Sequence, residues 1–225
     1  MSEQVEQLAA IREIRDIMAR SSRFLSLSGL SGVWAGSMAL LGAAAAFWAS
    51  DGRLFTNEPL ISLGYGAEHW PIANNPKLPF GLNLLHFLWL DAVAVFLLAL
   101  IGAFYFTFRR TQHTGHSIWD ATAQRLTVNL CIPLAAGGIF CLAMIYHHVF
   151  VLVAPATLLF YGMAVLNASK YTLNDIRYLG ILEIVLGLLA AFFSQYAIEF
   201  WAIGFGICHI LYGLIMYYKY ERKTA

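Results

Sequence analysis

The sequence predicts an all-α membrane protein in which six transmembrane helices form a single bundle. Hydrophobic residues make up 60% of the 225 residues and charged residues only 12%, against about 25% charged residues in ordinary soluble domains. The apolar residues come in runs of roughly 20, the length that crosses about 30 Å of hydrocarbon. The expected spans are approximately residues 25–48, 81–108, 125–146, 149–168, 176–194 and 197–218.

The distribution of positive charge predicts the orientation of these spans. All but two of the 14 Lys and Arg residues lie before the first span, in or beside the second–third and fourth–fifth connections, or after the last span. The two exceptions, Arg53 and Lys77, lie in the long connection that follows the first span. The positive-inside rule therefore places both termini in the cytoplasm, with the bundle in an inner (plasma) membrane.

The segments outside the spans divide the chain further. Residues 1–24 are expected to form a cytoplasmic amphipathic helix, because apolar residues within 3–20 repeat at helical spacing among charged ones. This helix can lie on the bilayer, or bind a protein partner or a second copy of the chain. The proline- and aromatic-containing loop 50–80 is either a lid over a cavity or a segment on the lipid headgroups. Residues 219–225 are expected to be a basic cytoplasmic tail.

Three ionisable side chains, Asp91, Glu183 and His209, fall near the middle of predicted spans. A charge there costs about 2.5–3.5 kcal/mol on insertion scales and usually faces a partner or water. In a hairpin that turns at Tyr196, Glu183 and His209 are equally distant from the turn, about 20 Å along each helix. The sequence therefore predicts that the acid and the imidazole lie at one depth, and we take Asp91, Glu183 and His209 as the candidate substrate- or ion-binding residues.

Glycines flank the acid and the imidazole at matching positions. Gly180 and Gly187 surround Glu183, and Gly206 and Gly213 surround His209. Small residues at this spacing let helices approach closely in lipid. We therefore expect these two glycine faces to pack the two helices of the hairpin against each other.

These residues support three readings of function. Buried acids beside an imidazole can hold a proton or cation, which favours a protein that passes or senses a small solute, proton or cation. Alternatively, the same groups only fasten helices in a non-catalytic membrane scaffold or accessory subunit. A third reading is a membrane redox subunit that uses His ligands. No arrangement of a nucleophile with a base indicates an enzyme, and no basic surface indicates nucleic-acid binding.

Four other histidines are weak candidates for a metal site. All four are expected near the outer face, where His69 lies in the long loop, His86 early in the second span, and His147 and His148 in the turn between the third and fourth spans. Imidazoles gathered at one level can bind Zn, Cu or a haem iron. Their spacing matches no known metal signature. We therefore expect no metal and no cofactor.

A short motif recurs in the second half of the chain. Phe160–Tyr161–Gly162–Met163 resembles Leu211–Tyr212–Gly213–Leu214. Spans 3 and 4 can therefore be an older copy of the hairpin formed by spans 5 and 6, or the match is a coincidence among Gly and Tyr residues.

Overall fold

A computed structural model describes residues 28–50, 78, 82–114 and 119–222. The expected amphipathic helix within residues 1–24, almost all of the 50–80 loop including His69, and residues 223–225 lie outside the described residues. Nearly all described residues are helical, in agreement with the predicted all-α class.

The principal helices follow the predicted spans. In chain order they are α2 (Gly29–Ala49), α4 (Leu84–Thr114), α5 (Ala121–Tyr146), α6 (Val153–Ala168), α7 (Ile176–Phe192), α8 (Ala197–Trp201) and α9 (His209–Met216). Short 3₁₀ turns lie at Phe150–Leu152, Ser169–Tyr171 and Ser194–Tyr196, and π-helical segments at Ala202–Cys208 and Tyr217–Glu221. The chain is therefore helical from Ser194 to Glu221, a segment that we call the C-terminal helix.

Five of the described helical segments are long and apolar enough to cross a membrane. These segments are Gly29–Ala49, Leu84–Gln112, Ala121–Tyr146, Phe150–Tyr171 and Ser194–Glu221. The 17 residues of α7 span about 25 Å at 1.5 Å per residue, the lower end of the length for a transmembrane helix. The fold is thus an array of five to six helices with the composition of a membrane protein.

Several helix ends differ from the expected ones. The second span continues to Thr114, and α5 begins at Ala121 rather than near residue 125. The earlier start has a local cause, because the Asp120 carboxylate accepts a hydrogen bond of 2.6 Å from the backbone N–H of Ala123 and caps the helix. The C-terminal helix extends to Glu221, so residues 219–221 belong to a helix and not to a tail.

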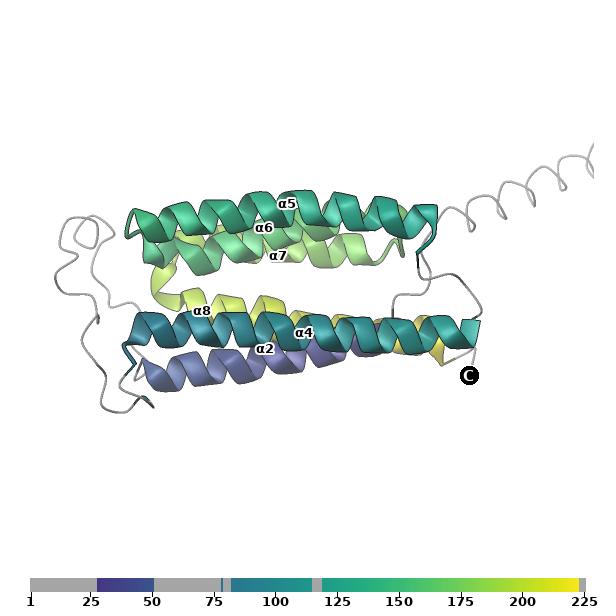
Figure 1. Ribbon diagram of the computed structural model, residues 1–225, viewed down its shortest axis with the longest axis horizontal. Helices are drawn as coiled ribbons and strands as arrows, with labels where there is room; N and C mark the ends of the chain where they lie inside the picture. The colour runs from purple at the N-terminus through teal and green to yellow at the C-terminus, as the bar shows by residue number, and fades with distance from the viewer. Residues whose placement is uncertain (1–27, 51–77, 79–81, 115–118, 223–225) are drawn as a thin grey trace, which may run out of the picture.

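The helices pack in two groups rather than in the single bundle that the sequence predicts (Figure 1). In one group α6 packs against both α5 and α7, and in the other α2 packs against both α4 and the C-terminal helix. The turn at Ser194–Tyr196 carries the chain from one group to the other (Figure 1).

The glycine faces explain why the hairpin separates into two groups. A Cβ atom at Gly180 would lie 2.7 Å from the backbone N of Leu166 in α6, and one at Gly213 would lie 2.6 Å from the backbone N of Val33 in α2. The expectation that these faces pack α7 against the C-terminal helix is therefore wrong. Each glycine face packs its helix against the middle helix of its own group, which is α6 for α7 and α2 for the C-terminal helix. Contacts across the boundary between the two groups are made by side chains.

Candidate functional site

The candidate site lies at the boundary between the two groups, and Glu183 is its most buried member. Glu183 lies midway along α7 with none of its surface exposed. Neither of its carboxylate oxygens has a hydrogen-bond partner in the part of the chain that the structure describes. Burying a polar group without compensating hydrogen bonds costs free energy. The groups nearest to Glu183 therefore bear directly on its role.

His209, the first residue of α9, supplies the nearest imidazole. Its Nδ1 lies 3.4 Å from Oε1 of Glu183, longer than the usual hydrogen-bond range of about 2.7–3.2 Å. The same Nδ1 lies 3.0 Å from the backbone carbonyl of Gly204, and Nε2 lies 2.7 Å from the Tyr161 hydroxyl. The imidazole is only 7% exposed. Both ring nitrogens are thus occupied, and Nδ1 is the one that faces the acid.

Tyr161 brings α6 into the site, and aromatic rings surround it. The centroid of its ring lies 5.3 Å from the His209 ring and 4.9 Å from the Phe205 ring. Trp201 also packs against Phe205, with ring centroids 4.9 Å apart. This apolar wall lowers the local dielectric and strengthens any charge interaction between the acid and the imidazole.

Gly204 makes room for the acid. It lies in the π-helical segment Ala202–Cys208, and a Cβ atom at this position would lie 2.5 Å from Oε2 of Glu183 and 2.6 Å from Cδ2 of Leu158. Real Cβ atoms essentially never approach so closely. Single-turn π-helical insertions are frequent at functional sites because they redirect side chains and backbone groups. Here the segment supplies both the space for the carboxylate and the carbonyl that faces His209.

Asp91 lies elsewhere, on α4. Its carboxylate faces Gly42 of α2, where a Cβ atom would lie 3.3 Å from Oδ2. The opposite contact of α2 is with the C-terminal helix, where Gly36 meets Gly206 and Ile210. Thus α2 stands between Asp91 and the acid–imidazole pair, and the three candidate residues do not form one cluster.

The outer histidines that the structure describes, His86, His147 and His148, form no metal-binding group either. His86 on α4 makes a 2.6 Å contact between its Nδ1 and Oδ1 of Asn83, and His147 ends α5 in the other helix group. His148 has a positive φ of 61°, a left-handed turn conformation that points the chain into the next helix. Among the described residues, no group of three His, Cys, Asp or Glu side chains is placed to hold a metal ion.

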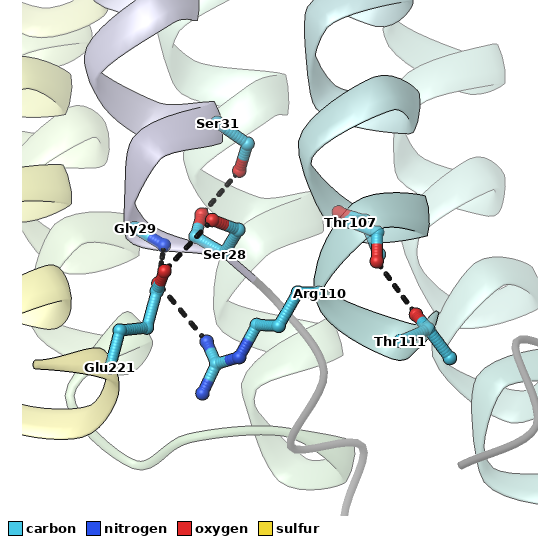
Figure 2. Close-up of polar contacts among 7 residues, drawn as sticks. All are labelled: Ser28, Gly29, Ser31, Thr107, Arg110, Thr111 and Glu221. Atoms are coloured by element: carbon cyan, nitrogen blue, oxygen red, sulfur yellow. Dashed lines mark hydrogen bonds and ion pairs between the residues drawn. The ribbon is translucent and has the colours of Figure 1, made fainter. Parts of the chain in front are cut away.

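A second polar cluster lies at the Glu221 end of the C-terminal helix (Figure 2). The Glu221 carboxylate accepts hydrogen bonds from the backbone N–H of Gly29 and from the Ser28 hydroxyl, the latter at 3.1 Å. Arg110 of α4 adds an ion pair of 3.1 Å to Oε1. Glu221 therefore caps the N-terminus of α2, whose own N-cap residue, Ser28, makes no side-chain cap.

Another contact at this end joins the two groups. Asp175, just before α7, makes an ion pair of 2.5 Å with Lys219 and accepts a hydrogen bond of 3.0 Å from the Tyr220 hydroxyl. The hydrogen bond from Lys219 lowers the pKa of Asp175, and partial burial opposes that shift. Consecutive residues of the C-terminal helix therefore contact both groups. Glu221 contacts α2 and α4, and Lys219 and Tyr220 contact Asp175, just before α7.

Comparison with protein-family models, with curated proteins and with solved structures found no match to this chain. The geometry of the site is therefore the basis from which a function is inferred.

Sequence reasoning missed three residues that build these clusters. Tyr161 stood out only through the repeated Tyr–Gly motif, and its counterpart Tyr212 has a buried hydroxyl with no hydrogen-bond partner among the described residues. Gly204 was hidden among several glycines, and Glu221 stood within an apparently basic tail. The motif was therefore a usable signal for Tyr161, whereas nothing in the local sequence distinguished Gly204 or Glu221.

Proposed function

We propose that this chain is a polytopic inner-membrane protein that passes a small solute, proton or cation, with Glu183 and His209 as the residues that take up and release the ion. The observation that carries the proposal is the Glu183 carboxylate, which is fully buried, has no hydrogen-bond partner among the described residues, and faces His209 Nδ1 at 3.4 Å. A group that served only as a fastener would gain most from being fully hydrogen-bonded.

The chemistry of the pair supports this proposal. Ionisable residues within membrane spans are costly and commonly mark ion and proton pathways. A buried carboxyl group favours its neutral form, whereas an adjacent imidazolium favours the carboxylate. The acid and the imidazole are therefore two adjacent groups between which a proton can move. A cation that displaces this proton would meet the two oxygens of Glu183 and the carbonyl of Gly204.

The orientation belongs to the same proposal, with both termini in the cytoplasm. Its support is the distribution of Lys and Arg between the connections. The test places single cysteines in a variant whose three native cysteines are replaced by alanine. Cysteines introduced by Asn57→Cys or Asn75→Cys should react with an impermeant thiol reagent added to intact cells, and those introduced by His116→Cys or Arg222→Cys should not. The reverse labelling pattern would overturn the orientation.

The decisive experiment measures ion movement in liposomes that contain the purified protein. Glu183→Gln keeps the shape of the side chain but removes its ability to exchange a proton, so it should abolish proton-coupled uptake. Asp91→Asn is the matched control, because it makes the same chemical change on the far side of α2 and should leave uptake close to that of the wild type. Proton, Na⁺ and K⁺ movements are recorded separately.

The possible outcomes of this experiment overturn different parts of the proposal. Wild-type uptake by Glu183→Gln would overturn the role of Glu183. Loss of uptake in Asp91→Asn but not in Glu183→Gln would move the site to α4. A stable wild-type protein that moves none of the three ions would remove the transport function and leave the scaffold or accessory subunit.

A further inference from the structure

The contacts around His209 bear on which ion the site carries and how that ion reaches Glu183, given the proposed function. Glu183 is 0% exposed and His209 is 7% exposed. Tyr161 makes a 2.7 Å hydrogen bond to His209 Nε2, the ring nitrogen that does not face the acid. A path to the acid can therefore run through the tyrosine and then the imidazole.

The carbonyl of Gly204 determines which nitrogen of His209 carries the proton. A carbonyl oxygen only accepts hydrogen bonds, so the 3.0 Å contact with Nδ1 requires that Nδ1 be protonated. In a neutral imidazole the other nitrogen is then an acceptor, and Tyr161 donates its hydroxyl proton to Nε2. The three residues thus form a directed chain of polar contacts. The Nδ1–H group faces Glu183, and Nδ1 lies 3.4 Å from Oε1.

We infer that the site carries protons and that Tyr161 is the residue through which they reach His209. A hydronium ion gives one proton to the Tyr161 oxygen while Tyr161 passes its own hydroxyl proton to Nε2. His209, now positively charged, releases its Nδ1 proton to the Glu183 carboxylate. One proton has entered and one has reached Glu183, and no electron has moved. The neutral ring is then protonated at Nε2, so its Nδ1-protonated form must be restored before a second proton can follow the same path.

The surroundings of His209 contain few groups that could replace this path. On the neighbouring helices, α7 presents Glu183 and α6 presents Tyr161, while α2 contains no ionisable side chain. On its own helix, the Cys208 thiol lies close enough to interact electrostatically with Glu183, and the Tyr212 hydroxyl has no hydrogen-bond partner among the described residues. Tyr161 is therefore the described hydroxyl group placed to pass a proton to Nε2.

The test compares two matched substitutions, Tyr161→Phe and Tyr212→Phe. Each removes one buried hydroxyl and keeps the ring, and in Tyr161→Phe the packing against Phe205 is retained. Because positioned proton-transfer groups contribute roughly 100-fold or more to rates, we expect Tyr161→Phe to slow proton uptake by about tenfold or more. Tyr212→Phe should leave uptake unchanged. Thermal unfolding of both variants checks that they fold.

A second readout follows the imidazole itself. In protein labelled with ¹⁵N-histidine, the His209 signal is assigned by its loss in His209→Gln. The neutral wild-type ring should be protonated at Nδ1, with an Nε2 signal displaced by the hydrogen bond from Tyr161. That displacement should disappear in Tyr161→Phe and persist in Tyr212→Phe.

The outcomes separate the relay from the proposed function. If Glu183→Gln stops proton uptake and Tyr161→Phe does not slow it, the relay is wrong and the proposed function stands. A neutral His209 protonated at Nε2 also overturns the relay. If wild-type protein moves Na⁺ or K⁺ but no protons, the choice of ion is wrong. If it moves no ion, the proposed function falls and the relay falls with it.

Discussion

Two glutamates in this protein have opposite environments. Glu183 is fully buried at the boundary between the helix groups and has no hydrogen-bond partner among the described residues. Glu221 is partly exposed at the end of the C-terminal helix and is bound by Gly29, Ser28 and Arg110. The more costly location therefore has the fewer compensating contacts.

The environments of Glu221 and Glu183 indicate different roles for the two residues. A carboxylate that accepts hydrogen bonds from a helix N-terminus and from an arginine stabilises the folded state. An acid buried without such bonds lowers stability, because it loses its hydration and gains little in return. Glu221 has the contacts of a residue that stabilises the fold, whereas Glu183 lacks them, in keeping with the ion-exchanging role that we propose for it.

The same substitution at both glutamates gives the largest expected contrast. Glu221→Gln replaces an acceptor oxygen with an NH₂ group that faces other donors and removes the charge opposite Arg110. Since hydrogen bonds to charged groups are worth about 1.5–3 kcal/mol, we expect a loss of about that size in the free energy of unfolding. Glu183→Gln should lose no stability, because no hydrogen bond to its carboxylate is broken. Thermal and denaturant unfolding in detergent measure both.

The opposite ranking would break the comparison. If Glu183→Gln destabilises the protein more than Glu221→Gln does, then Glu183 serves mainly to hold the two helix groups together. Its unpartnered oxygens would no longer argue for a site that exchanges an ion.

A smaller effect is expected at Gly204, which separates the position of Glu183 from its chemistry. In Gly204→Ala the new methyl group would lie 2.5 Å from Oε2 of Glu183 and must displace the carboxylate or Leu158. Overpacking of this kind costs about 1–3 kcal/mol, and we expect about 1 kcal/mol here because the carboxylate can move. Proton uptake should fall although Glu183 is unchanged.

Gly138→Ala is the matched control for this substitution. A Cβ atom at Gly138 meets nothing within 4 Å, so the variant should keep both wild-type stability and wild-type uptake. Equal behaviour of the two alanine variants in unfolding and uptake assays would show that the placement of the Glu183 carboxylate beside Gly204 is unimportant.

Part of this architecture could be predicted from the sequence, because helices in lipid obey simple rules of length and composition. Counting outward from Tyr196 placed Glu183 and His209 at one depth, and the structure places their side chains 3.4 Å apart. The direction in which the glycines face could not be predicted. A row of small residues indicates that some helix packs there, but the partner is determined by the shapes of all the others.

The polar contacts were harder to predict than the spans. Tyr161 contacts a residue 48 positions away, and Glu221 caps a helix 192 positions away. Such contacts depend on the position of the helices in three dimensions, which composition and periodicity do not encode. Asp91 shows the opposite error. Its predicted depth is similar to that of Glu183, yet α2 lies between the two residues.

The cap on α2 also affects the order in which the protein can be assembled. The backbone N–H of Gly29 finds its acceptor in Glu221, 192 residues later, and at ordinary rates of synthesis this interval lasts roughly 10–40 s. During that time α2 is already made while its first turn lacks this acceptor. The contact forms only when the last turn of the C-terminal helix arrives beside α2 and α4. Translation and insertion must therefore bring Glu221 into place before the first described helix has its native N-terminus.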